Sequence, residues 1–120
     1  GLSMQFETLN ENDEVVLQAS PEEKQQLIDF IDASLNTDQI DLADHAFVSV
    51  PEVRAIRDAI SGQADGDQLT LSRYEFVHLS QLATAWRGYG FGVHGEDADL
   101  DVSRHLVDGI HRMFDAAFPA

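Results

Sequence analysis

Apolar side chains alternate in part with polar ones near the start of the chain, and over most of the rest they recur every three or four positions. Residues 4–18 hold two short runs of apolar and β-branched side chains around the polar cluster of residues 10–13. This pattern predicts a β-hairpin over residues 4–18. An isolated hairpin is only marginally stable, so we expect it to pack on the helices that follow. Residues 1–3 precede Met4 and are given no structural weight.

The stretch of residues 20–118 is predicted to be helical. Ser20, Ser49 and Ser72 each precede a glutamate by three positions, which is the spacing of a capping box at a helix start. The apolar stripes predict helices over residues 21–35, residues 38–47, a stretch from Ser49 to about Ser61, residues 73–87 and residues 102–117. A polar loop is expected at residues 63–68, and the four glycines of residues 88–95 exclude a stable helix there.

The last predicted helix has the clearest amphipathic pattern, and Asp99 or Asp101 is expected to cap it. No repeat or linker interrupts the chain, so residues 1–120 are expected to form a single domain. The fold class that follows is mainly α: a bundle of four to five short helices with an N-terminal β-hairpin.

The composition narrows the classes of function. The 120 residues include 22 acidic and 7 basic ones, which gives a formal net charge of −15. Such a charge repels phosphates, so we expect neither a nucleic acid nor an anionic membrane as a partner. The absence of cysteine excludes disulfides, thiol catalysis and thiolate metal sites. Because no membrane-spanning run and no targeting segment are visible, we expect a cytoplasmic protein.

Three interpretations of the charge stay open. An acidic surface with little lysine occurs as an adaptation to salt-rich solvent, and Lys24 is the single lysine of the chain. An acidic protein can also bind a basic one, as an inhibitor or immunity protein covers a basic active site. The charge can finally serve solubility alone. The acids are spread along the chain, which favours the first and third interpretations, and their densest run is residues 96–101.

The segment of residues 86–93 interleaves aromatic residues with glycine. Tyr89, Phe91 and Val93 alternate, so one interpretation is a short edge strand beside the hairpin. Another is that Trp86 and Phe91 pack in the core. If the segment is exposed, its rigid aromatic side chains suit a protein-binding hot spot. The candidate partner-binding residues are Trp86, Tyr89 and Phe91, with Glu96, Asp97 and Asp99 as an acidic rim.

Glu75 and His78 form an E-x-x-H pair, the type that helices contribute to di-iron bundles. At about 100° per residue, both lie in the apolar sector of the predicted helix. That sector also contains Tyr74, Leu79, Leu82, Ala85 and Trp86. The capping box gives the carboxylate of Glu75 a partner in the backbone N–H of Ser72, and His78 can bond a carbonyl or the Tyr74 phenol.

A second E-x-x-H half-site does not appear, because Asp108 of residues 108–111 falls on the polar face of the last helix. We therefore expect no metal site, with Glu75 and His78 as the candidates if one exists. His111 and its neighbouring acids are explained by i,i+4 pairs on an exposed helix face.

Two further sequence matches lack the surrounding structure or spacing that their binding motifs require. Residues 90–95 match G-x-G-x-x-G, but a predicted helix precedes them and carboxylates follow, so we expect no dinucleotide cofactor. Residues 65–76 look at first like half of a calcium EF-hand, yet Leu69 stands where that loop needs glycine, so a polar turn is expected. No nucleophile-elbow, zinc-protease or phosphate-loop motif occurs, and we expect neither an enzyme nor a cofactor.

The function expected from these observations is that of a non-enzymatic, acidic protein-interaction module. Its favoured target is a basic protein, in an inhibitor or immunity role. The first alternative is a helical metal- or small-molecule-binding protein that uses Glu75 and His78. The second is a self-associating domain, such as a homodimer, whose charge is an adaptation to salt.

Overall fold

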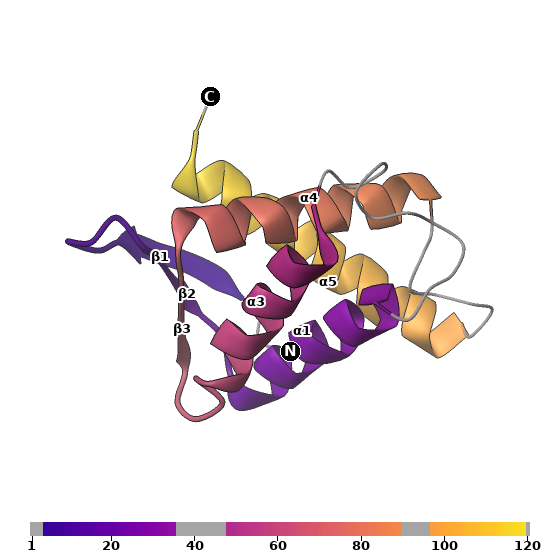
Figure 1. The fold of residues 1–120 in the computed structure, drawn as a ribbon. Helices are drawn as coiled ribbons and strands as arrows, with labels where there is room; N and C mark the ends of the chain where they lie inside the picture. The colour runs from indigo at the N-terminus through magenta and orange to yellow at the C-terminus, as the bar shows by residue number, and fades with distance from the viewer. Residues whose placement is uncertain (1–3, 36–47, 90–96, 120) are drawn as a thin grey trace.

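The computed structural model describes residues 4–35, 48–89 and 97–119, with the backbone alone at residues 87–89 and 97–103. The elements follow in the order β1 (Gln5–Leu9), β2 (Val15–Gln18), α1 (Pro21–Leu35), α3 (Val50–Ser61), β3 (Gln68–Leu71), α4 (Arg73–Tyr89) and α5 (Asp97–Ala117). Figure 1 shows a small sheet at one end of the molecule and the helices of the described chain packed beside it. The predicted mainly helical fold with an N-terminal hairpin is confirmed.

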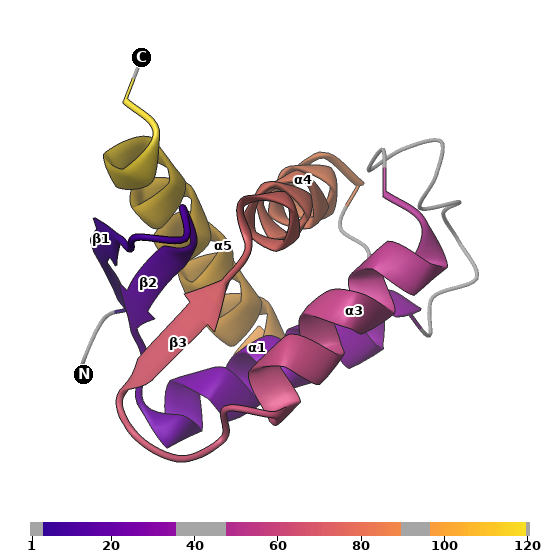
Figure 2. The same cartoon turned by 60° about the vertical axis from the view of Figure 1, so that its left-hand side comes forward.

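The strands form an antiparallel sheet in the order β1-β2-β3. Leu17 in the central strand lies opposite Phe6 on β1 and Leu69 on β3, and its side chain is fully buried. The register of β1 against β2 shifts between Phe6 and Thr8, which is a β-bulge at Glu7. In Figure 2 the sheet lies at the left with α5 behind it, and α4, α3 and α1 lie to the right.

The bulge residue Glu7 connects the three strands on the outer face of the sheet through side-chain hydrogen bonds. Glu7 accepts hydrogen bonds from the side-chain amides of Gln18, at 2.9 Å, and Gln68, at 3.0 Å. Gln18 and Gln68 are directly opposite each other on β2 and β3. One carboxylate therefore connects all three strands on the face turned away from the helices.

Capping boxes open three of the helices. In each, the serine hydroxyl accepts from the glutamate backbone N–H while the glutamate carboxylate accepts from the serine N–H. The pairs are Ser20 with Glu23, Ser49 with Glu52 and Ser72 with Glu75. The predicted starts of α1 and α4 are confirmed, and α1 also ends at residue 35 as predicted.

The core lies between the inner face of the sheet and the apolar faces of the helices. Its buried members come from β2, β3 and the described helices, and β1 adds partly buried side chains that pack against them. The face predicted for the last helix is confirmed by the burial of Val107, Ile110 and Met113. The largest fully buried apolar side chains are Leu17, Leu27, Ile31, Ile56, Ile60, Leu69, Leu71, Phe76, Leu79 and Leu82. Burial of these side chains is the main favourable contribution to folding.

Several boundaries differ from the predictions. The polar loop of residues 63–68 leads into β3, which the sequence pattern did not predict. The strand has four residues, and such a short stretch shows no clear alternation of apolar and polar side chains. The α4 helix continues through Gly88 and Tyr89, since its preceding turns extend it past the first glycine. The α5 helix begins at Asp97, so neither Asp99 nor Asp101 is its cap. The helix predicted for residues 38–47 lies outside the described residues.

Lys24 is buried within α1, with 1% of its surface exposed. Its ammonium group donates to the backbone carbonyls of Gln63, at 2.6 Å, and of Asp65 and Gly66, both at 3.0 Å. These carbonyls belong to the turn between α3 and β3, where the sequence resembles an EF-hand without the right spacing. The ammonium group of Lys24 therefore binds the carbonyl groups of this turn and connects α1 to the turn.

The described helices include none that is both long enough and apolar enough to cross a membrane.

Candidate functional site

Tyr74 has the most exposed large hydrophobic side chain of the described residues, with 78% of its surface accessible. It is the second residue of α4. Val50, at 40%, is the other large hydrophobic side chain that is exposed in the described part of the chain. An exposed tyrosine combines apolar area with a polar tip, and this residue type is enriched at protein interfaces.

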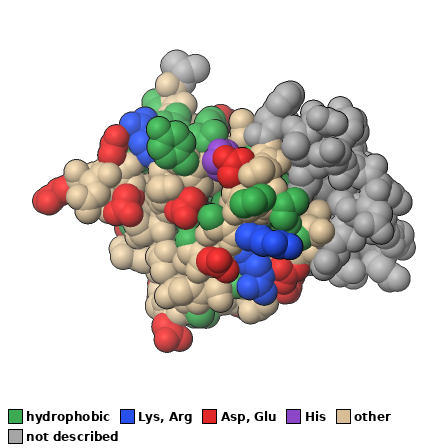
Figure 3. All heavy atoms as spheres, viewed as in Figure 1, with side chains coloured by type: hydrophobic (Ala, Val, Ile, Leu, Met, Phe, Trp, Pro, Cys, Tyr) green, Lys and Arg blue, Asp and Glu red, His purple; other side chains and the backbone are tan. Residues whose placement is uncertain are grey.

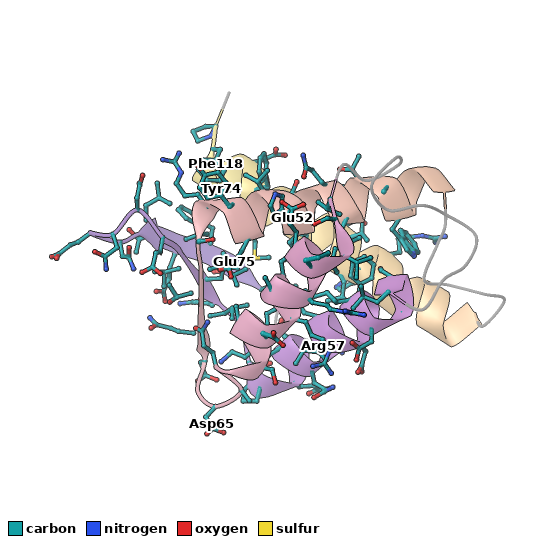
Figure 4. The ribbon with its side chains drawn as sticks, in the orientation of Figure 1. Glu52, Arg57, Asp65, Tyr74, Glu75 and Phe118 are labelled. Carbon is teal, nitrogen blue, oxygen red and sulfur yellow. The ribbon has the colours of Figure 1, made fainter. Side chains whose placement is uncertain are left out.

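A surface hollow of about 580 Å³ lies beside Tyr74, between the β1–β2 turn and the first turns of α4. We call it the Tyr74 hollow. It is lined by Asn12, Asp13, Glu14, Ser72, Arg73, Tyr74 and Val77. Figure 4 shows Tyr74 at the end of the molecule where α4 begins, and its neighbour Arg73 reaches Phe118, just beyond the end of α5. The hollow therefore brings together an exposed ring, two carboxylates and one guanidinium.

The β1–β2 turn aims a carboxylate at α4. Asn10 holds the turn, because its side-chain oxygen accepts from the backbone N–H groups of Asn12 and Glu14, both at 2.9 Å. Asp13 has a φ of 64°, in the left-handed region, which aspartate tolerates better than most residues. Its Oδ2 accepts from Nη1 of Arg73 at 2.7 Å.

Arg73 is held from a second direction by an aromatic cluster. Its guanidinium carbon lies 5.1 Å from the ring centroid of Phe118, which is cation–π distance. The Phe118 ring packs against Phe114 at 5.3 Å and Phe76 at 6.2 Å. Phe76 is fully buried, so this cluster runs from the core to Arg73, which lines the hollow. On the face shown in Figure 3, hydrophobic and basic side chains meet near the start of α4, with acidic side chains around them.

A second hollow, of about 460 Å³, lies over the polar face of the sheet. Its lining includes Glu7, Gln18, Glu23 and Gln68. These side chains hydrogen-bond to one another or to the α1 capping box. Their hydrogen bonds serve the fold, and no aromatic side chain lines this hollow.

Glu75 and His78 have separate partners. Glu75 completes the capping box of α4, as predicted, with its Oε1 2.8 Å from the backbone nitrogen of Ser72. The Nε2 of His78 lies 3.2 Å from Oε2 of Glu52 on α3, a partner that the sequence did not indicate. The Ser49 hydrogen bonds to Glu52 lower the pKa of that carboxyl, and His78 acts in the same direction.

Among the described side chains, no group of three histidine, aspartate or glutamate residues is placed to hold a metal ion. Glu75 is engaged by the start of α4, and His78 by a carboxylate of another helix. The E-x-x-H spacing therefore marks a helix cap and an interhelical contact in this fold.

The residues of the aromatic segment 86–93 have different places in the structure. Trp86 lies in the core with 5% of its surface exposed, as the packing interpretation predicts. Tyr89 is the last residue of α4, so it does not start the edge strand that we considered, and the third strand is β3 instead. Phe91 and Glu96 lie outside the described residues. Asp97 and Asp99 are in the first turn of α5, where the backbone alone is described.

Tyr74 lies outside the apolar sector of α4, so its predicted place there is wrong. The buried stripe of α4 includes Phe76, Leu79 and Leu82. At about 100° per residue, Tyr74 falls about 130° from the centre of the buried stripe. The sequence feature that indicates the correct face is Phe76. When Phe76 is counted among the apolar residues of the helix, the predicted core face turns away from Tyr74.

Comparison with known proteins gives no relative: no protein-family model, no curated protein and no solved structure matches the chain.

Proposed function

We propose that this chain is a protein-interaction module that binds a basic partner at the Tyr74 hollow. The observation that supports this most directly is the 78% exposure of Tyr74 in a fold that buries its other described aromatic rings wholly or in part. Burying such a ring in a partner's surface is a typical source of binding free energy. The hollow beside it offers concave space for a partner side chain.

The charge of the molecule selects the kind of partner. The net charge is −15, and one of the few cations, Lys24, is buried and bonded to backbone carbonyls. Asp13 and Glu14 line the hollow itself, against the single cation Arg73. A field of this sign accelerates association with a positively charged protein and slows it with an acidic one.

The proposal is tested by placing a photo-crosslinking amino acid at position 74 in the producing cells. The matched control carries the same amino acid at Val50, the other exposed large hydrophobic position. We expect a partner that is captured at position 74 and not at position 50, and whose own net charge is positive. Capture at both positions alike, or at neither, contradicts the proposal.

The captured partner is then purified and titrated with the wild-type protein, Tyr74→Ala and Val50→Ala. We expect Tyr74→Ala to weaken binding by at least about tenfold, the effect of a moderate hot spot, and Val50→Ala by less than about twofold. The association rate should fall as salt is raised from about 0.05 to 0.5 M. An affinity that Tyr74→Ala leaves unchanged, or an association rate that salt leaves unchanged, refutes the assignment.

A further inference from the structure

The Tyr74 hollow already binds a guanidinium, and it belongs to the chain itself. Nη1 of Arg73 lies 2.7 Å from Oδ2 of Asp13, and its Cζ lies 5.1 Å from the centre of the Phe118 ring. A charge-assisted hydrogen bond to a carboxylate and a ring face beneath the planar group are the two contacts by which proteins hold arginine. The site is therefore built for this group, since both contacts are satisfied at once.

Arg73 is held loosely enough to be exchanged. The Asp13 side chain is 63% exposed and the Arg73 side chain 48% exposed. Exposed ion pairs of this kind contribute little to stability, because water and salt compete for both charges. The fold does not depend on the pair, since the turn of Asp13 is fixed by Asn10 and the start of α4 by Ser72 and Glu75.

The chemistry of the hollow favours arginine over lysine as the group bound from outside. A guanidinium is planar and weakly hydrated, so it can lie against a ring while its edge donates to a carboxylate. The Phe118 ring and the Asp13 carboxylate offer these two features at the place that Arg73 occupies. An ammonium group gains less from the ring face and keeps more of its hydration.

We propose that the Tyr74 hollow binds an arginine side chain of the basic partner, and that Arg73 occupies the place of this side chain in the free protein. This inference rests on the proposed function and names the group that the site recognises. When the partner binds, its guanidinium takes the contacts with Asp13 and Phe118, and Arg73 turns outward to solvent. Arg73 thus competes with the partner and lowers the affinity of the free site.

The test uses Nα-acetylarginine amide and Nα-acetyllysine amide as probes, titrated into the ¹⁵N-labelled protein and followed by chemical shifts. Arg73→Gln removes the internal competitor, and Arg54→Gln makes the same change of charge at an exposed position of α3. We expect Arg73→Gln to bind the arginine probe about fivefold more tightly than the wild type, the combined effect of one exposed ion pair and one cation–π contact. Arg54→Gln should stay within about twofold of the wild type, because it changes only the net charge.

A second variant locates the effect. Adding Asp13→Asn to Arg73→Gln should abolish the gain and the shifts at the hollow, and asparagine tolerates the left-handed backbone at position 13. Equal gains in Arg73→Gln and Arg54→Gln, equal binding of the two probes, or a gain that survives Asp13→Asn each overturn the inference. None of these results affects cross-linking at Tyr74, so failure of the arginine site and failure of the proposed function are separate outcomes.

Discussion

Lys24 shows how one buried side chain can determine the shape of a turn. In the helical periodicity of α1, it shares a face with Leu27, Ile28 and Ile31. A lysine on an apolar stripe needs compensation for its lost hydration. Here three carbonyl groups of residues 63–66 provide it, and the same contacts fix the turn that leads into β3.

Replacing Lys24 with methionine should destabilise the protein. Methionine fills a similar volume but leaves the partly buried carbonyl partners in residues 63–66 without this donor, and each such loss costs up to about 1–3 kcal/mol before water compensates. We expect a net loss of about 3 kcal/mol in the free energy of unfolding, measured by urea denaturation. The matched control is Arg54→Met, which removes an exposed cation from α3 and should change stability by less than about 0.5 kcal/mol. Equal losses in the two variants would show that the carbonyl contacts of Lys24 do not stabilise the fold.

At the scale of elements, Glu52 links the start of α3 to the middle of α4. One of its oxygens accepts from the Ser49 backbone N–H at 2.8 Å, and the other lies 3.2 Å from Nε2 of His78. The start of α3 and its packing on α4 therefore share one carboxylate. Asp32 and Arg57 form a similar connection between α1 and α3, with two contacts at 2.6 and 3.2 Å.

The shared carboxylate makes this pair of helices sensitive to acid. The Ser49 hydrogen bonds, with a smaller contribution from His78, lower the pKa of Glu52 from its ordinary value of 4.5. A lowered pKa in the folded state means that the contribution of Glu52 to stability is present above pH 4.5 and is lost as the pH falls through the folded-state pKa. Glu52→Gln keeps an acceptor for Ser49 and cannot be protonated in this range, so its stability should fall less steeply than that of the wild type below pH 5.

The measurement is a series of urea unfolding curves from pH 6 to about pH 3. Glu22→Gln is the control for the removal of one negative charge, since Glu22 is an exposed residue in the first turn of α1. If both variants lose stability with acid in parallel, the hydrogen-bonded position of Glu52 has no special part in acid sensitivity.

At the scale of the whole molecule, the net charge of −15 contrasts with an ordinary core of apolar side chains. The acidic side chains that the structure describes are all exposed or partly exposed, and the single lysine does not offset them at the surface because it is buried. Charge of this magnitude affects association and solubility rather than the choice of fold. We therefore attribute its cause to the solvent, through salt adaptation or solubility, or to a partner.

A calorimetric melt in about 0.2 M and then about 2 M potassium chloride separates these two causes. Screening of surface charge is nearly complete at the lower concentration, where the Debye length is below about 8 Å. If the charge serves to bind a basic partner, we expect the melting temperature to change by less than about 5 °C between the two conditions. A much larger rise would indicate adaptation to salt and would remove the charge from the argument for a basic partner.

The sequence by itself determined the hairpin and the starts of α1, α3 and α4, because these depend on contacts between residues that are close along the chain. Serine and glutamate three positions apart are enough to specify a capping box, and residues 10–13 are enough to specify a turn. The core face of α5 followed from periodicity for the same reason. The sequence also indicated an acidic surface with no cysteine, without showing what that surface contacts.

The tertiary structure alone decided the features that join distant parts of the chain. Pairing with β2 made a strand of residues 68–71, and the approach of residues 63–66 to α1 gave Lys24 its partners. The packing of α4 through Phe76 left Tyr74 outside, next to a turn 60 residues earlier that contributes Asp13 to the same hollow. Such contacts depend on how the elements pack in space, and no local pattern along the chain records that geometry.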